Sequence, residues 1–382
     1  MRNERGIALL LVLWILAALI VLAISLSVIA RTETQIARNY SDVVCCRWAA
    51  RAGLNCAVAT VESLAKDSQT YLGEGGKKLS SDTEGVDLGD ASFDVIIEDE
   101  AGKVNVNTAS AEVLEALFAG KEIADCVIDW RDSDDQPLLM GAETPYYSGL
   151  KTPYRCKNAQ LETVGEMLVV KGLTEDILSV PAGESVKPLK DLVTVYSQDQ
   201  NQSSAGKPRV NVQTATQEQL KSELGDVLTD QDIQSIIRQR GQKKFDTAAQ
   251  VALTVGLERD KVRRIYDRIT VSDSKTLPGL ISVNTAPVDV LAVLPGMDRR
   301  VASEVVAQRE ADGPYADVGQ ILRISAVTTQ AFAKWADMLT VRSRVFKITS
   351  VGRMTMSQSS SKLTCIVDMS DGKSAKIRYW QE

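Results

Sequence analysis

The chain has 382 residues, which is enough for two or three domains, and its 44% hydrophobic content can build real cores. The formal net charge is −6. A negative overall charge argues against a nucleic-acid partner, because nucleic acids are negatively charged themselves. The sequence contains no histidine, which excludes a Ser-His-Asp or Cys-His catalytic unit and a His-ligated zinc or iron site.

The sequence predicts a membrane-spanning helix at its start. No residue from Ile7 to Ala30 is charged, and at ~1.5 Å per residue this run is long enough to cross a bilayer core of ~30 Å. The preceding Arg2, Glu4 and Arg5 form a net basic segment, which favours a cytoplasmic N-terminus. A secretory signal peptide has a shorter apolar region that is followed by a cleavage site of small residues. This run is too long and lacks such a site, which argues against a signal peptide. A plain membrane anchor remains the alternative.

Beyond Arg31 the helical pattern continues and becomes amphipathic. Apolar residues recur every four positions, at Ile36, Tyr40, Val44 and Trp48. No proline interrupts residues 7–66, so we predict one continuous helix, with its first part in the membrane and its second part on a globular head. Three of the six cysteines fall on this helix, where we expect small buried residues rather than disulfide bonds: Cys45, Cys46 and Cys56.

The start of the chain resembles that of the type IV pilins and pseudopilins. Their precursors carry a short basic leader that ends in Gly directly before an apolar helix. A prepilin peptidase cuts after this Gly, and the new N-terminal amine is methylated. The resemblance implies a leader at residues 1–6 and cleavage between Gly6 and Ile7.

The fifth residue of the mature helix departs from the common pilin pattern. Most pilins have a Glu here, whose carboxylate is thought to neutralise the amine of a neighbouring subunit, whereas this chain has Leu11. An unpaired charge in hydrocarbon is costly, so such a Glu is needed only where a partner amine exists. The K-type minor pseudopilins of type II secretion systems typically lack this Glu, and their apolar start is similar to residues 9–14. The chain therefore resembles the general secretion pathway protein K family.

The sequence also predicts a sheet built from two distant parts of the chain. Residues 67–90 are a polar, Gly-rich connector, and Ala91–Glu98 has the pattern of a strand. Three more strands are predicted near the C-terminus, at Ser343–Gly352, Leu363–Met369 and Lys376–Trp380. We therefore expect an α+β fold, in which residues 91–103 and 343–382 form a pilin-like antiparallel sheet and residues 104–342 are inserted as an all-helical region.

The inserted region contains a threefold internal repeat. Each copy begins with an extended segment and an Asn/Gln-Thr-Ala turn, at Val104–Ala109, Val210–Ala215 and Ile281–Ala286. A second helical segment in each copy reaches an arginine, at Ile123–Arg131, Ile233–Arg240 and Val301–Arg309. One such unit buries too little apolar surface alone, so we expect three two-helix units that stack or lean on a neighbour, near residues 104–180, 208–272 and 280–340. Residues 181–207 and 273–279 have the composition of linkers.

These units resemble helix-hairpin-helix modules, which raises the alternative of a membrane-anchored DNA-binding or DNA-uptake protein. In that family a Gly-x-Gly turn holds a phosphate with its backbone N–H groups. The corresponding turns here are Gly120-Lys121-Glu122, Gly225-Asp226-Val227 and Gly296-Met297-Asp298. None keeps both glycines and each has an acidic residue near the phosphate position, so we expect no nucleic-acid partner.

Copy one carries an insertion of about twenty residues after its arginine. Asp132, Asp134 and Asp135 gather three carboxylates, with Asp129 one turn earlier and Glu143 beyond them. Such a loop can fold around a hard cation through oxygen ligands, or it can be a solvated acidic loop. The run D-W-x-D-x-D-D, followed by G-A-E and paired tyrosines, is similar to the signature loop of the K-type family, whose members bind calcium. The resemblance implies a structural calcium held by Asp132, Asp134, Asp135 and Glu143.

Cys126 and Cys156 lie on either side of this loop. An exported location permits disulfides, so these two cysteines are the first candidates for a bond.

No constellation of residues supports an enzyme, since the phosphate-binding, nucleophile-elbow and dinucleotide motifs are absent. The resemblance implies a structural subunit that caps the tip of the periplasmic pseudopilus in type II protein secretion. Its implied partners are the I- and J-type minor pseudopilins, the major pseudopilin and the prepilin peptidase. The chain would cross the bacterial inner membrane once, with its N-terminus cytoplasmic and its head periplasmic.

Overall fold

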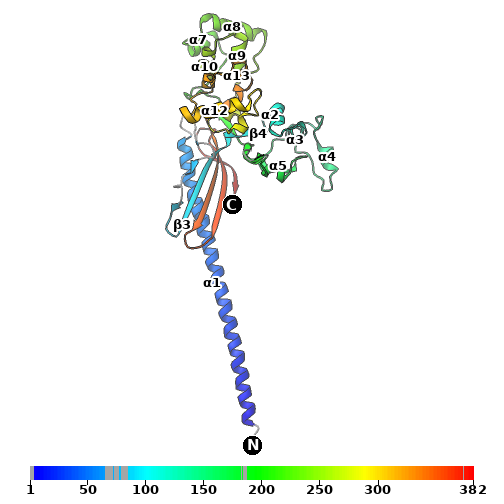
Figure 1. Cartoon of the computed structure of the whole chain (residues 1–382), viewed down its shortest axis with the longest axis vertical. Coiled ribbons are helices and arrows are strands. Elements are labelled where there is room, and N and C mark those ends of the chain that lie inside the picture. The colour runs from blue at the N-terminus through cyan, green and yellow to red at the C-terminus, as the bar shows by residue number, and fades with distance from the viewer. Residues whose placement is uncertain are drawn as a thin grey trace.

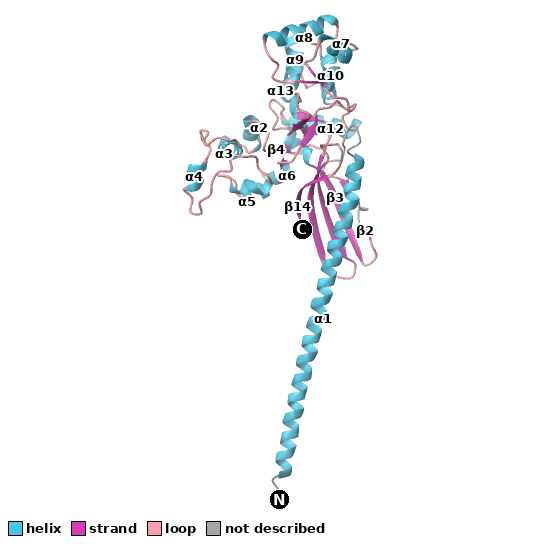
Figure 2. Cartoon of the chain, turned by 180° about the vertical axis from the view of Figure 1, so that it is seen from behind, coloured by secondary structure: helices cyan, strands magenta, loops and turns pink. Residues whose placement is uncertain are grey.

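The computed structural model of this chain describes residues 4–64, 72, 77–78, 85–181, 183, 187–372 and 374–382. Figure 1 shows an elongated molecule in which one long helix carries a sheet along its upper half, and a helical region lies above the sheet. The view from behind shows the same arrangement, with part of the helical region projecting sideways as an arm (Figure 2). The predicted α+β fold is confirmed.

Helix α1 runs without interruption from Glu4 to Leu64. It begins before Ile7, inside the predicted leader, while positions 65 and 66 of the predicted helix lie outside the described residues. The side chains of its apolar first half are exposed, and its second half packs on the sheet. Among its cysteines, Cys46 is buried, whereas Cys45 and Cys56 are exposed.

The sheet contains strands from both ends of the head, as predicted. Its main order is β1-β3-β12-β13-β14, with β2 also paired to β3, and all of these pairings are antiparallel. The strands are β1 (Lys77–Lys78), β2 (Val86–Asp87), β3 (Ala91–Asp99), β12 (Val345–Met354), β13 (Ser360–Asp368) and β14 (Lys376–Gln381). Most of the Gly-rich connector predicted at 67–90 lies outside the described residues.

Helix α1 lies close to β3, β12 and β13 because small residues line the contact. A Cβ at Gly352 would stand 2.0 Å from the main-chain oxygen of Cys46, and one at Gly53 would stand 2.4 Å from Ser350 Oγ. Ala49, Ala50 and other buried residues of α1 form a core here with alternate residues of the strands. The first hydrophobic core therefore joins the membrane helix to the sheet.

Three copies of one small helical unit follow β3 and precede β12. In each copy a short first strand pairs in parallel with a short last strand, β4 with β5, β7 with β8, and β10 with β11. These strands are β4 (Val104–Asn105), β5 (Val193–Thr194), β7 (Val210–Asn211), β8 (Ile269–Thr270), β10 (Ile281–Ser282) and β11 (Leu339–Thr340). Copy one thus closes at Thr194, later than predicted, because its last strand must return to Val104.

Each copy contains several short helices. Copy one has α2 (Ala111–Leu117), α3 (Lys121–Arg131), α4 (Thr144–Ser148), η2 (Val164–Val169), α5 (Glu175–Ser179) and α6 (Leu189–Leu192). Copy two has α7 (Gln217–Leu224), α8 (Asp230–Gln242), α9 (Ala248–Val255), α10 (Arg259–Ile265) and η3 (Tyr266–Arg268). Copy three has α11 (Val288–Leu291), α12 (Arg299–Asp312), η4 (Val318–Arg323), α13 (Thr329–Trp335) and η5 (Ala336–Met338).

The arginine that recurs in the repeat has the same role in all three copies. The Arg309 guanidinium donates to the main-chain oxygens of Val283 and Ala286, both at 2.7 Å. Arg240 and Arg131 donate to the matching pairs of carbonyls in copies two and one. The arginine therefore satisfies the carbonyls of the Asn/Gln-Thr-Ala turn and ties the second helix to the start of its copy.

A side-chain amide makes a second recurring contact. Asn284 exchanges two hydrogen bonds with the backbone of Tyr315, and Asn107 does the same with Leu161. Leu161 is therefore the copy-one counterpart of the aromatic residue in the other copies. It follows Arg131 by 30 positions, whereas Tyr315 follows Arg309 by six, which locates the insertion between Arg131 and Leu161.

The two predicted linkers pair with each other instead of remaining free. Strand β6 (Gln198–Gln200) runs antiparallel to β9 (Thr276–Pro278). Asp199 in β6 also accepts hydrogen bonds from Thr340 and Arg342, and Gln198 donates to Asp368 in the sheet. The polar composition of residues 198–200 therefore reflects buried hydrogen bonding rather than a flexible linker.

Copies two and three share one hydrophobic core, while most of copy one has a core of its own. Figure 1 shows the consequence: copies two and three stack above the sheet, and copy one projects to the side as an arm that carries α3, α4 and α5. The acidic insertion lies in this arm.

Candidate functional site

The apolar half of α1 is the first candidate functional element. This helix is long and apolar enough to cross a membrane, and none of its most apolar window is buried within the protein. The side chain of Leu11 is 57% exposed, and no carboxylate stands at its position. Gly6 and Ile7 lie within the first turns of α1, and their side chains lie outside what the structure describes. An exposed apolar surface of this size requires a lipid environment or a partner helix.

The acidic loop of copy one is the second candidate, and two carboxylates of α3 shape it. Asp129 accepts the backbone N–H of Leu138 at 3.2 Å, and Asp125 accepts that of Met140 at 3.1 Å. A Cβ at position 141 would stand 1.8 Å from Asp129 Oδ2, so only Gly141 lets the loop pass so close. Helix α3 therefore folds the loop back over its own last turn.

Three acidic side chains meet under this loop. Asp129, Asp132 and Glu143 each have a carboxylate oxygen within 4.8 Å of the others. Glu143 is only 2% exposed, and within the described part of the chain neither of its oxygens, nor Asp132 Oδ1, accepts a hydrogen bond. The Cys156 thiol lies beside Glu143, but it donates to the main-chain oxygen of Asp129 at 3.7 Å. Buried carboxylate oxygens without donors are costly unless a cation or a proton compensates them.

The electrostatics of the three carboxyl groups follow from their burial. Burial, together with the nearby charges of Asp129 and Asp132, raises the pKa of Glu143 to about 7. Burial also raises the pKa of Asp129 and of Asp132, and neighbouring carboxylates add to both effects. A divalent cation would reverse this by favouring the charged forms. The donor set contains only oxygens and fits a hard ion such as calcium.

The cluster contains two of the four predicted metal ligands. Asp132 and Glu143 belong to it, whereas Asp134 and Asp135 are exposed and accept the backbone N–H groups of Gln136 and Thr144 at 2.9 and 3.2 Å. Asp129 takes part instead. Asp129 lies about one helical turn before Asp132, which caps the C-terminus of α3, and this spacing was the sequence signal that could have identified it.

The predicted disulfide between Cys126 and Cys156 is not formed in the structure. Both cysteines are buried and free, and each thiol has a separate acceptor: Cys126 donates to the main-chain oxygen of Met140, and Cys156 to that of Asp129. The loop is held by carboxylate-to-backbone hydrogen bonds, and both thiols belong to the core of the arm.

Aromatic side chains support the loop from below. Tyr147 is fully buried and contacts the rings of Trp130, Tyr146 and Tyr154. The Trp130 indole donates to Glu166, which also pairs with Lys157 at 2.9 Å. The paired tyrosines therefore pack the insertion onto the arm, and no arrangement for catalysis involves them.

In copies two and three, the helices that follow the helix-hairpin-helix turns are capped by their own side chains. In copy two, Thr229 caps α8 and Asp232 caps Thr229 in return, while Lys261 pairs with Asp232 at 2.7 Å. In copy three, the carboxylate of Asp298 accepts the N–H of Val301 at the start of α12. These helix N-termini are already satisfied by their own side chains, two of which are negatively charged.

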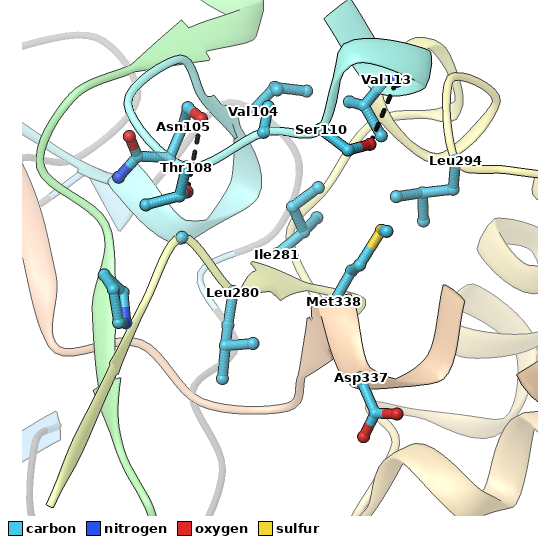
Figure 3. Close-up of a pocket in the computed structure, with 13 residues that line it drawn as sticks. Val104, Asn105, Thr108, Ser110, Val113, Leu280, Ile281, Leu294, Asp337 and Met338 are labelled. Atoms are coloured by element: carbon cyan, nitrogen blue, oxygen red, sulfur yellow. Dashed lines mark hydrogen bonds between the residues drawn. The ribbon is translucent and has the colours of Figure 1, made fainter. Parts of the chain in front are cut away.

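A cavity of about 170 Å³ lies where copy one meets copy three. Figure 3 shows that Leu280, Ile281, Leu294 and Met338 line much of it, and that Thr108 and Ser110 make local hydrogen bonds at its edge. Asp337 at its border accepts hydrogen bonds from Tyr266 and Ala249. The cavity is an apolar gap between repeats and carries no catalytic constellation.

Comparison with known proteins agrees with this architecture. The family model "Type II secretion system (T2SS), protein K" matches residues 97–198, and the model "Helix-hairpin-helix motif" matches residues 279–340. The type II secretion system protein K of Klebsiella pneumoniae is 27% identical over 198 residues, which cover 45% of this chain and 59% of that protein. A putative type II secretion system protein K of Escherichia coli K12 is 28% identical over 46% of this chain and 61% of that protein.

The chain thus spans about 60% of the length of the curated relatives it matches. Among solved structures, the GspK-GspI-GspJ complex of enterotoxigenic Escherichia coli contains a chain with the same fold. The TM-score is 0.52 at 15% identity, and the match covers 92% of this chain and 98% of that chain. The family model over residues 97–198, these relatives and the shared fold all make the chain similar to type II secretion system protein K.

Proposed function

We propose that this protein is a minor pseudopilin, a structural and non-catalytic subunit of a type II secretion system. The observation that carries the proposal is the continuity of α1, which extends from an apolar membrane-length segment into a sheet-bearing head with a helical insertion. The match of residues 97–198 to the protein K family model and the similarity to protein K of other bacteria support the same role. The helix anchors the protein in the bacterial inner membrane and the head lies in the periplasm.

Processing by a prepilin peptidase between Gly6 and Ile7 creates the mature N-terminus, and methylation of the Ile7 amine follows. Support comes from the basic residues before Gly6 and from the apolar helix that begins directly after it. Removal of the leader eliminates its charges, so that the mature helix can slide in the membrane during assembly.

The protein caps the tip of the pseudopilus, above the major pseudopilin and together with the I- and J-type minor pseudopilins. The helical insertion adds bulk above and beside the sheet, where a packed filament wall leaves little space (Figure 1). Leu11 fits the same position, because a terminal subunit has no subunit above it whose amine needs a carboxylate. The known complex of GspK with GspI and GspJ supports this choice of partners.

Calcium binds under the insertion and stabilises the arm. Asp132, Glu143 and Asp129 would hold the ion, since they bring three carboxylates together and leave buried oxygens without hydrogen-bond donors. The ion supplies positive charge that these groups otherwise lack. Asp134 and Asp135 keep the shape of the loop through its backbone.

Mass spectrometry of the mature N-terminus tests the proposal. The protein is expressed with its secretion system, and we expect an N-methylated Ile7 as the first residue. In a Gly6→Ala variant, the same analysis should find the leader retained. An intact leader in the presence of active peptidase would contradict the pseudopilin role and would favour a plain anchor.

Partner binding is tested by co-purification with the I- and J-type minor pseudopilins of the same system. We expect a complex of the three proteins after detergent extraction. A control protein with an unrelated head on residues 1–40 separates membrane co-localisation from specific contact. Absence of the complex, with all three proteins folded, would contradict the tip position.

A further inference from the structure

We propose that Asn158, rather than Asp134 or Asp135, supplies the neutral oxygen ligand of the cation in the arm, and that it helps to select calcium over magnesium. The inference rests on the proposed calcium function and specifies which residues of this chain carry it. It follows from the buried oxygens, the contacts of Asn158 and the charge of the site.

Several buried side-chain oxygens among the described residues of the arm lack a hydrogen-bond donor. Within the described part of the chain, four buried oxygens of the arm accept no hydrogen bond: Asp132 Oδ1, Glu143 Oε1, Glu143 Oε2 and Asn158 Oδ1. Native structures rarely leave several such atoms in one place, and an unfilled ion site is a physical reason for them. Asn158 contributes the only amide oxygen of this set.

Asn158 is joined to the acidic cluster on both sides. On one side its amide nitrogen donates to the main-chain oxygen of Asp134, whose own N–H donates to the carboxylate of Asp132. On the other side its backbone N–H donates to the sulfur of Cys156, the residue that lies beside Glu143. Asn158 is therefore connected to Asp132 through Asp134, and to Glu143 through Cys156.

The backbone and the amide of Asn158 are both fixed in orientation. Its φ of 47° is in the left-handed region, where Asn and Asp are tolerated better than other side chains with a Cβ. Because the amide nitrogen is used by Asp134, the oxygen is the end of the amide that remains available. An amide oxygen that is held in a fixed orientation and accepts no hydrogen bond can coordinate a calcium ion.

Asp134 and Asp135 do not offer buried oxygens of this kind. Both side chains are exposed, and one oxygen of each already accepts a backbone N–H within the loop. They lie outside the three carboxylates that approach one another within 4.8 Å. Their charges act on the loop surface, where solvent screens them.

Charge and size then favour calcium. Asp129, Asp132 and Glu143 already place three negative charges around one position, so a further carboxylate would add repulsion, whereas an amide adds an oxygen without charge. Both oxygens of Glu143 are free, which permits bidentate binding. Bidentate carboxylates and protein carbonyls suit the six to eight ligands of calcium, whereas magnesium requires a small octahedron and retains water.

The test is a calcium titration of the purified full-length protein in detergent, by calorimetry, with magnesium as a parallel titrant. We expect Asn158→Ala to weaken calcium binding by at least about tenfold and to reduce the preference for calcium over magnesium. Asn158→Asp should bind calcium more tightly than Asn158→Ala, because it restores an oxygen and tolerates the same backbone conformation, but less tightly than the parent, because it adds a fourth carboxylate. Glu143→Gln should abolish the binding.

Asp134→Asn and Asp135→Asn are the matched controls and should bind calcium within about twofold of the parent protein. Hydrogen exchange of residues 281–340 should be unchanged in every variant, which shows that copy three remains folded. Parent-like calcium binding by Asn158→Ala overturns the inference. So does a loss of binding in Asp134→Asn or Asp135→Asn that equals the loss in Glu143→Gln. If the parent protein binds no calcium, the cation proposal itself fails, and this inference fails with it.

Discussion

Copies one and three are the same unit with different surroundings. Both close with a two-residue parallel pairing, and in both an arginine binds two carbonyls while an amide binds the backbone of a later residue. Copy three shares its core with copy two, whereas most of copy one packs on itself. Only copy one carries a long insertion with buried carboxylates.

The comparison separates the residues that make the fold from those that make the site. The recurring arginine and amide satisfy backbone groups, so they are required wherever the unit occurs, whatever its function. The acidic residues of the insertion satisfy no backbone ladder of the unit, and several of their oxygens have no donor. The acidic insertion of copy one therefore sits on the same scaffold as copy three, which is how functional sites are commonly placed on folds.

The largest expected effect tests the shared scaffold. Arg309 is 2% exposed and donates to two carbonyls, so Arg309→Met should lower the free energy of unfolding by about 4 kcal/mol through lost charged hydrogen bonds and unsatisfied oxygens. Arg131→Met in copy one should cost about half as much, because Arg131 is partly exposed and water can replace it. Urea unfolding of both variants measures the difference. Equal costs would show that the cores around the two arginines are equivalent.

The next effect tests the difference between the copies. Chelation of calcium should destabilise copy one by about 3 kcal/mol relative to a solution at one hundred times the dissociation constant. Hydrogen exchange should then increase in residues 125–158 and remain constant in residues 281–340, because the carboxylates repel one another only in the arm. Magnesium at the same concentration serves as the control for ionic strength. An equal increase of hydrogen exchange in both copies would show that calcium stabilises copy three as much as copy one.

The smallest effect concerns the contact between copy three and the sheet. Asp99 at the end of β3 accepts hydrogen bonds from Thr285 Oγ1 at 2.5 Å and from Ala101 N–H at 2.7 Å. Burial raises the pKa of Asp99 to about 6. The folded protein therefore binds this proton more tightly than the unfolded chain, so the contribution of Asp99 to stability is complete below about pH 4 and is lost as the pH rises through about 6.

Asp99→Asn removes this titration and retains the ability to accept from Ala101. The stability of Asp99→Asn relative to the parent should accordingly rise by about 2 kcal/mol between pH 4 and 7, as measured by urea unfolding at a series of pH values. A constant difference across this range would show that the carboxylate is charged in the folded protein throughout. Thr285→Val, which removes the donor without adding a charge, is the matched variant for this contact.

Regular local patterns allowed much of the fold to be predicted. The run from Ile7 without charge or proline predicted α1, alternation predicted β3 and the three C-terminal strands, and the recurring Asn/Gln-Thr-Ala turns predicted the three copies. Each of these features depends on neighbours within a few positions, where periodicity and capping decide the conformation.

Contacts between distant residues required the tertiary structure. Residues 198–200 have the polar composition of a linker, but they pair with β9, about 80 positions away, and with Thr340, about 140 positions away. Because these partners are so distant, the sequence alone could not show that the polar groups are used. Leu161 could be matched to Tyr315 only through the amide contact that both share. The acidic cluster of the arm likewise depends on contacts that the sequence pattern does not reveal.

The sequence by itself thus determined that this chain has a membrane-length helix, a divided sheet, three repeated units and an acidic insertion in the first of them. Composition and spacing identified the acids, but the direction of each carboxylate depends on where α3 ends and how the loop folds back over it. Only the tertiary structure brought the carboxylate of Asp129 close to those of Asp132 and Glu143, left Asp134 and Asp135 exposed, and left Cys126 and Cys156 as free thiols with separate acceptors. Side-chain direction in a loop is set by packing against distant residues, and no local pattern encodes it.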